Sequence, residues 1–216
     1  MEACALAAFV PTAPRSLEDV QGTTLRKLSP RVGVVAPALP PALVLAGGSS
    51  AAPTAQAVTS APAPTEAQRR FEVQFMKRMV DHHFMAVLMA EQCTARARHE
   101  RLSGQCAEIA EAQREGIRTM RSWLRRWYGT DHQPELGMVE RAQLRELASA
   151  LGARFEVMVM QMFIDHHAVA IIRAEDCVRR AYHGRLRELC RTMVEMQLEE
   201  IARFRQFLRR WYGIYA

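Results

Sequence analysis

The sequence predicts an all-α protein, a four-helix bundle made of two duplicated helical hairpins with a short linker helix. Residues 71–129 align with residues 155–213 at an offset of 84, and about half of the aligned positions are identical. Phe-Glu-Val opens both copies, and Leu-Arg-Arg-Trp-Tyr-Gly closes both. Apolar residues recur at spacings of three and four, which is a helical period and not the alternation of a strand.

Each copy is predicted to form two helices joined by a polar turn. In the first copy these are residues 71–98 and 102–128, and the glycines Gly129 and Gly213 stand where helices commonly end. One hairpin cannot bury its apolar face alone, so the two copies should pack as a bundle with pseudo-twofold symmetry. Residues 130–154 link the copies, and ERAQLRELASALG within them should form an extra helix that ends near Gly152.

Residues 1–64 differ from the folded region expected at 65–216. They are rich in Ala, Pro, Ser, Thr and Gly, and basic residues precede an apolar run at 32–45, as in a secretory signal. The prolines in this run, and its length below the ~20 residues of a membrane helix, make it a poor anchor. We expect export to the periplasm or extracellular space and no integral membrane span in the mature protein. An Ala/Pro-rich tail that is not a signal is the alternative.

The net charge of +6 comes almost wholly from arginine. A basic balance can favour nucleic acid or anionic membranes. Here the arginines are interleaved with glutamates along helical stretches, and no block of five like charges occurs. This pattern is typical of a solvated mixed-charge surface, and no nucleic-acid partner is expected.

Four cysteines form two pairs, Cys93 with Cys106 and Cys177 with Cys190, each separated by 13 positions. The midpoint of each pair falls at the predicted turn, so the two cysteines should lie at the same height on neighbouring helices. A disulfide in each hairpin is therefore geometrically reasonable and would fit an oxidising compartment. Buried free thiols and a four-cysteine zinc site are alternatives, although the 13-residue gap lacks the tight spacing of zinc ligands.

Asp-His-His occurs at the same place in both copies, about a dozen residues into the first helix. Adjacent residues on a helix point about 100° apart, so one histidine of each pair can face the interior while the other lies at its flank. Twofold symmetry could bring all four to one level. Imidazole with thioether sulfur suits copper, particularly Cu(I). The predicted metal ligands are His82, His83, His166, His167, Met79, Met85, Met89 and Met162.

Asp81 and Asp165 could orient these histidine rings as hydrogen-bond acceptors, or contribute a ligand to Cu(II). The simpler interpretation is that the methionines fill the core and the histidines are hydrogen-bonded core residues, with no cofactor. The second copy has less sulfur, because Val169 and Arg173 replace Met85 and Met89. A methionine-rich site should therefore centre on the first copy.

No catalytic motif is evident in the sequence. Di-iron bundles use Glu-x-x-His on paired helices, and no glutamate stands three residues before any of the histidines considered. Phosphate-binding loops, nucleophile elbows and C-x-x-C redox motifs are absent from the sequence. We therefore expect a protein that is not an enzyme.

The segments FEVQFMKRMVDHHFMAVLMAE and FEVMVMQMFIDHHAVAIIRAE, followed by IAEAQREGIRTMRSWL and MVEMQLEEIARFRQFL, resemble the bacterial family known as domain of unknown function 305. The resemblance covers residues 71–212 as two tandem copies. It implies a ferritin-like helical bundle that is usually exported, with some members that bind copper in the periplasm and contribute to copper resistance.

The family pattern places paired histidines after a methionine and ends in Gln-x-x-Glu-Ile-x-x-Met. The matching residues here are His82, His83, Met79, Met89, Gln113 and Met120 in the first copy, and His166, His167, Gln197 and Glu200 in the second. Departures are Gly116, which stands where glutamate is usual, and Phe163, Arg173 and Phe204, which replace methionines.

Two functions are compatible with these features. The leading hypothesis is an exported copper carrier or buffer that holds the metal ion through His and Met side chains. The alternative is a helical interaction module without metal, in which Trp127 and Tyr128, and their counterparts Trp211 and Tyr212, form a docking surface for a partner protein.

Overall fold

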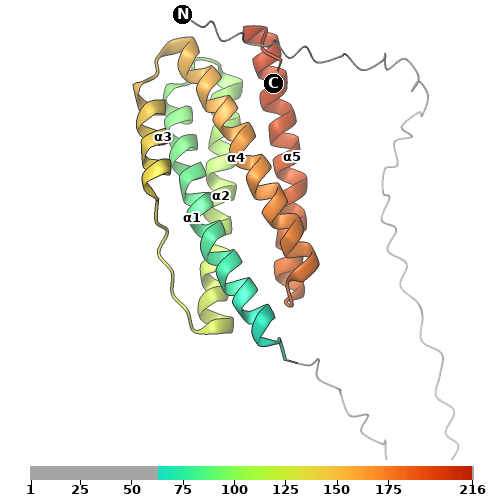
Figure 1. The fold of residues 1–216 in the computed structure, drawn as a ribbon. Helices are drawn as coiled ribbons and strands as arrows, with labels where there is room; N and C mark the ends of the chain where they lie inside the picture. The colour runs from blue at the N-terminus through green and yellow to red at the C-terminus, as the bar shows by residue number, and fades with distance from the viewer. Residues whose placement is uncertain (1–62, 216) are drawn as a thin grey trace, which may run out of the picture. The chain divides into compact units, whose positions relative to one another are not determined.

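The protein is described by a computed structural model that covers residues 63–215. This part of the chain holds five helices and no strands: α1 (Glu66–Arg96), α2 (Glu100–Tyr128), α3 (Met138–Ser149), α4 (Gly152–Arg180) and α5 (Gly184–Tyr212) (Figure 1). The predicted all-α class is confirmed. The expected signal-like segment, residues 1–64, lies outside the described residues except for its last two.

The helices begin and end close to the predicted positions, for identifiable local reasons. The Thr65 side chain accepts a hydrogen bond from the Gln68 backbone, and the Gln68 side chain accepts one from the Thr65 backbone, which is a capping box at the start of α1. Gly129 and Gly213 end α2 and α5 with left-handed backbone. The linker helix ends at Ser149, earlier than predicted, and Gly152 begins α4 instead of closing α3.

The long helices form two antiparallel hairpins, α1 with α2 and α4 with α5 (Figure 1). The hairpins meet through α1 and α4, and α3 packs against both of these helices. Two clusters of buried apolar side chains fill the interior, and each cluster takes residues from all four long helices. The hairpins therefore bury their apolar faces against each other.

α4 is long and apolar enough to count as a candidate membrane span among the described residues, with a mean hydropathy of 1.3 over its most apolar window. Half of that window is buried within the fold. Phe155, Val159 and Phe163 on this helix are fully buried core residues. Core packing therefore accounts for part of the apolar composition of α4.

Both expected disulfides are formed, so none of these four cysteines is a free thiol or a zinc ligand in the structure. Cys93–Cys106 joins α1 to α2, with Cα atoms 5.9 Å apart, and Cys177–Cys190 joins α4 to α5, with Cα atoms 6.3 Å apart. Each bond lies near the turn of its hairpin, as the equal spacing on either side of the turn predicts. The α1–α2 and α4–α5 turns lie at opposite ends of the helices (Figure 1), so each bond ties its hairpin at a different end.

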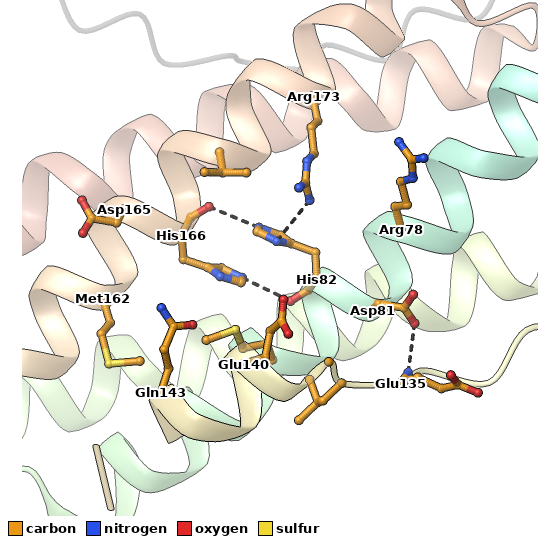
Figure 2. Close-up of a pocket in the computed structure, with 14 residues that line it drawn as sticks. Arg78, Asp81, His82, Glu135, Glu140, Gln143, Met162, Asp165, His166 and Arg173 are labelled. Carbon is orange, nitrogen blue, oxygen red and sulfur yellow. Dashed lines mark hydrogen bonds between the residues drawn. The ribbon is translucent and has the colours of Figure 1, made fainter. Parts of the chain in front are cut away.

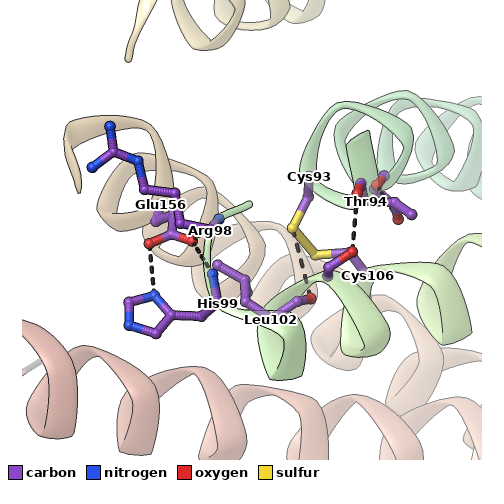
Figure 3. Close-up of a disulfide and its surroundings, with 9 residues drawn as sticks. Cys93, Thr94, Arg98, His99, Leu102, Cys106 and Glu156 are labelled. Carbon is purple, nitrogen blue, oxygen red and sulfur yellow. Dashed lines mark hydrogen bonds and ion pairs between the residues drawn. A yellow bond between two sulfur atoms is a disulfide. The ribbon is translucent and has the colours of Figure 1, made fainter. Parts of the chain in front are cut away.

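A buried carboxylate on α4 binds the turn of the other hairpin (Figure 3). Glu156 Oε1 accepts hydrogen bonds from the backbone N–H groups of Arg98, at 2.6 Å, and His99, at 2.9 Å. Its Oε2 lies 2.8 Å from His99 Nδ1 and accepts a hydrogen bond from the Tyr212 hydroxyl. His99 is the N-cap of α2, so the negative charge sits at the positive end of that helix. We call this set the Glu156 clasp.

The same arrangement recurs at the opposite end as the Glu72 clasp. Glu72 on α1 accepts hydrogen bonds from the His183 backbone N–H, at 2.8 Å, and from the Tyr128 hydroxyl, and its Oε2 lies 2.6 Å from His183 Nδ1. His183 is the N-cap of α5. Trp127 stacks on this histidine ring with centroids 3.9 Å apart.

The pKa of Glu156 reflects the hydrogen bonds of its clasp. Burial acts to raise this pKa, but the hydrogen bonds from Tyr212 and His99 outweigh burial, and the pKa lies below its usual value. Trp211 stacks on His99 with centroids 4.0 Å apart. The aromatic residues that the interaction-module hypothesis assigned to docking therefore pack within the chain, against the turn histidines.

The interiors of the two hairpins carry different polar groups. The buried His83 ring lies over Gly116, where an added Cβ would stand only 2.7 Å from Cδ2 and 2.9 Å from Nε2 of the ring. In the second hairpin Glu200 takes the place of Gly116, and its carboxylate lies 2.9 Å from His167 Nε2 without hydrogen-bond alignment. The Nδ1 atoms of both histidines are buried and have no hydrogen-bond partner among the described residues.

Replacing Glu72 or Glu156 with glutamine should remove the charge that holds each clasp. We expect each substitution to lower the free energy of unfolding by about 2 kcal/mol, since buried hydrogen bonds to a charged group contribute about 1.5–3 kcal/mol. The two losses should add, because the clasps lie at opposite ends. Urea unfolding measures the change. Glu175→Gln, at an exposed site on α4, is the control, and a loss as large in this variant would contradict the clasp.

Gly116→Ala and Gly104→Ala test the contact between His83 and Gly116. Both glycines lie in α2, but a Cβ at Gly104 meets nothing within 4 Å. Alanine should therefore stabilise at Gly104 by about 0.5–1 kcal/mol through helix propensity. At Gly116 the Cβ would displace the imidazole, which costs about 1–3 kcal/mol and exceeds that gain. Thermal or chemical unfolding that shows equal stabilisation at both positions would disprove the packing.

Candidate metal-binding site

Two histidine rings stack on each other where α1 crosses α4. The centroids of His82 and His166 are 3.6 Å apart and the ring planes differ by 2°. His82 Nε2 lies 3.2 Å from the His166 carbonyl oxygen, and His166 Nε2 lies 3.1 Å from the His82 carbonyl oxygen. The pair is reciprocal, and the pseudo-twofold axis of the two hairpins passes between the rings.

The hydrogen bonds of the pair determine the tautomer of each ring. A carbonyl oxygen can only accept, so both Nε2 atoms carry the proton, and the lone pair of each neutral ring lies on Nδ1. His82 Nδ1 lies 3.5 Å from an Arg173 guanidinium nitrogen. His166 Nδ1 has no hydrogen-bond partner among the described residues, so its lone pair is available to a ligand.

Burial keeps these rings neutral. Burial, together with the positive charge of Arg173, lowers the pKa of His82 to about 4 against the opposing effect of the carbonyl hydrogen bond. Burial also lowers the pKa of His166 well below its usual value. In the first hairpin, burial and the neighbouring histidines lower the pKa of His83 to about 3. Neutral imidazole is the form that binds a metal ion.

The stacked rings line a cavity of about 620 Å³ between α1, α4, α3 and the linker before α3 (Figure 2). Four carboxylates and two guanidinium groups also border it. Its lining residues are Arg78, Asp81, His82, Met85, Glu135, Leu136, Gly137, Glu140, Gln143, Met162, Asp165, His166, Val169 and Arg173.

The cavity has a sulfur side and an arginine side. In Figure 2, Met162 and Gln143 lie on one side of the histidine pair, and Arg78 and Arg173 lie on the other. The two sides are related by the repeat, because Met162 and Arg78 are equivalent positions, 84 apart, as are Met85 and Val169. The difference therefore comes from substitutions between the two copies. Met85 and Met162 both pack against the apolar cluster that includes Leu147 of α3. Both thioethers are therefore on the side covered by α3.

The structure divides the predicted ligands into two groups. His82, His166, Met85, Met162, Asp81 and Asp165 all line the cavity. The remaining four are buried elsewhere, His83 and His167 inside their own hairpins and Met79 and Met89 in the apolar core. The four histidines thus do not converge on one point.

Asp81 binds the linker in this structure. One of its oxygens lies 2.8 Å from His132 Nε2 and accepts a hydrogen bond from the Glu135 backbone N–H at 2.9 Å. Sequence reasoning did not identify His132 or the α3 residues Glu140 and Gln143 as part of the site. His132 and Glu135 are three residues apart in a polar linker, which gave no periodic signal.

The described residues hold no group of three or more His, Cys, Asp or Glu side chains placed to bind a metal ion together. The only nitrogen donors at the cavity are the two stacked imidazoles. A metal ion that prefers nitrogen and hard oxygen ligands would lack a preformed site here. A soft metal ion could use the thioethers of Met85 and Met162 in addition.

Solved structures share this fold. The Cu(I)-bound form of CopM is 24% identical, with a TM-score of 0.59, over 66% of this chain and 98% of CopM. A DUF305 protein from Streptomyces coelicolor, whose name describes it as secreted, is 27% identical with a TM-score of 0.58, over 64% of this chain and 90% of its own. A DUF305 fragment from Deinococcus radiodurans is 24% identical with a TM-score of 0.60, over 69% of this chain and 99% of the fragment.

A search of curated proteins finds no match to this chain. The family model for a domain of unknown function, DUF305, matches residues 72–208 as one segment. This segment begins near the start of α1 and ends near the end of α5, so one family domain contains both hairpins and the cavity. The chain therefore belongs to the DUF305 family.

Proposed function

We propose that this protein binds Cu(I) as cargo in the cavity between α1, α3 and α4. The observation that carries the proposal is that two neutral imidazoles and two thioethers line one cavity. Thioether and imidazole are ligands that suit Cu(I), whereas Mg²⁺ and Ca²⁺ prefer several oxygen ligands. We assign the binding to His166 Nδ1 with the sulfur atoms of Met85 and Met162, because this nitrogen has a free lone pair and both sulfurs lie on the α3 side.

His82 holds the site in place. Its ring stacks on His166, and its carbonyl oxygen accepts a hydrogen bond from the Nε2–H group of His166. This hydrogen bond fixes the tautomer that leaves His166 Nδ1 free for metal. Arg173 occupies the corresponding nitrogen of His82, so the pair offers one ring to a metal ion and keeps the other as its support.

The relatives support a metal-binding role. CopM has been crystallised in Cu(I)-bound, Cu(II)-bound and Ag-bound forms. We infer an exported carrier or buffer, because both hairpins carry a disulfide and a structural neighbour is described as secreted. A small set of thioether and imidazole donors at an open cavity suits reversible storage or transfer, and we propose no catalytic reaction for this cavity.

Competition with a chromogenic Cu(I) chelator tests the ligand assignment. Met85→Leu and Met162→Leu keep the side-chain volume and remove sulfur. We expect the double variant to bind Cu(I) at least about 100-fold more weakly, if each lost ligand costs about 1.4 kcal/mol or more. His166→Ala should lose binding to a similar extent.

Met79→Leu/Met89→Leu is the matched control, because these methionines are buried outside the cavity. Its Cu(I) affinity should stay within about threefold of the parent protein, which corresponds to roughly 0.6 kcal/mol. If the control variant loses copper and Met85→Leu/Met162→Leu retains it, the metal is held in the hairpin interior and the cavity assignment is wrong.

Acid should weaken the fold through the same buried rings. The pKa values of His82, His83 and His166 are lowered in the folded state, so the unfolded chain binds more protons below pH 6.5. The metal-free protein should therefore lose stability as the pH falls from about 6.5 towards 4, by up to about 1.4 kcal/mol per pH unit per histidine. Urea unfolding at several pH values measures this slope. If the variant His82→Asn/His166→Asn shows the same dependence of stability on pH, these two histidines are not its cause.

A further inference from the structure

The pseudo-twofold axis gives the α1–α4 interface two equivalent grooves, and α3 covers only one of them. On the covered side the Arg96 guanidinium lies 4.0 Å from the Phe155 ring and donates hydrogen bonds to the carbonyl oxygens of Leu147 and Ala150 at the end of α3. On the other side the equivalent Arg180 lies 4.2 Å from the equivalent Phe71 ring. There, no linker supplies acceptors among the described residues.

The uncovered groove is a cavity of about 420 Å³, within the size range of small-molecule sites. It is lined by Ala67, Arg70, Phe71, Gln74, Phe75, Arg78, Arg173, Asp176 and Arg180. Four guanidinium groups and one carboxylate thus line the groove. We call this cavity the arginine groove.

Arginine stands in the uncovered groove at positions where the groove beneath α3 has methionine. Arg78 and Arg173 are equivalent to Met162 and Met89, which pack into the apolar cluster beneath α3. Solvent exposure alone would be met by any polar residue, including the glutamates and glutamines common in this chain. Instead both positions carry arginine, and both line the arginine groove as well as the neighbouring cavity with the histidine pair.

Two of the four arginines have no carboxylate partner. Arg180 pairs with Asp176 at 2.8 Å, and Arg70 approaches Glu66 at 3.7 Å in an exposed pair. Arg78 and Arg173 form no ion pair with any described residue, and Arg173 contacts the neutral ring of His82 at 3.5 Å. The two planar guanidinium groups are therefore free to bind an anion from solution.

We propose that the arginine groove binds a small oxyanion that carries two or more negative groups, either phosphate or carboxylate. Arg78 on α1 and Arg173 on α4 hold one group between the helices, and Arg70 and Arg180 lie further along the groove for a second. Guanidinium groups bind both kinds of oxygen pair through two parallel hydrogen bonds. None of the four arginines is an assigned metal ligand, and Arg78 and Arg173 line both the arginine groove and the neighbouring cavity.

Titration calorimetry of the metal-free full chain with pyrophosphate, and separately with citrate, tests the proposal at 150 mM salt. We expect binding of one equivalent of at least one of these anions. Arg78→Ala/Arg173→Ala should weaken it at least about tenfold, since each lost charge-assisted contact contributes to affinity. Arg118→Ala/Arg203→Ala removes the same charge from arginines that pair with glutamates elsewhere and should change the affinity by less than about twofold.

The two anions and a vesicle experiment separate the sources of the ligand. Binding of pyrophosphate alone or of citrate alone assigns phosphate or carboxylate chemistry and upholds the groove. If the protein sediments with phosphatidylglycerol vesicles and Arg78→Ala/Arg173→Ala does not, the phosphate belongs to a lipid headgroup. This result also supports the arginine groove as the binding site. The proposal is overturned if no anion or vesicle binds, or if both double variants weaken binding equally, because net charge would then be the whole effect.

Discussion

Two buried carboxylates organise this fold, because each neutralises the partial positive charge at the start of a helix in the opposite hairpin. Glu156 accepts hydrogen bonds at the N-cap of α2, and Glu72 does so at the N-cap of α5. Neither helix has a hydrogen bond from the side chain of its own N-cap residue. A helix start left without a partner is costly when buried. Each hairpin thus needs the other to bind the start of one of its helices and to bury its apolar face. These two kinds of contact together place α1 against α4.

The crossing of α1 and α4 determines where His82 and His166 stack. Because α3 covers the α1–α4 interface on one side of this pair only, the two sides of the interface differ. Stacked His82 and His166 lie on the axis itself, where symmetry brings equivalent residues together. Residues away from the axis occur twice, once beneath α3 and once in the open. Met162 lies on the covered side, whereas its equivalent Arg78 lies on the open side. A single short linker helix therefore gives one sulfur-lined and one arginine-lined groove from a duplicated scaffold.

Much of the fold could be predicted from the sequence, because the repeat supplies two independent views of the same hairpin. Helix ends at Gly129 and Gly213 and the disulfides follow from local spacing alone. The candidate site was predictable only in part. Both faces of α1 at the Asp-His-His motif are apolar, so the period cannot say which histidine faces the other hairpin. The clasps required a different inference, from the glutamates, turn histidines and terminal tyrosines that are identical in both copies but far apart in sequence.

The reciprocity of the clasps has a further consequence. Each takes its glutamate, tyrosine and tryptophan from one hairpin and its histidine turn from the other. A single hairpin carries both halves of this contact, so two separate copies of one hairpin could make the whole set as an isologous dimer. Joining them in one chain removes the dependence of such an assembly on protein concentration. It also allows the two hairpins to have different sequences. Gly116 in the first hairpin and Glu200 at the equivalent position of the second are such a difference.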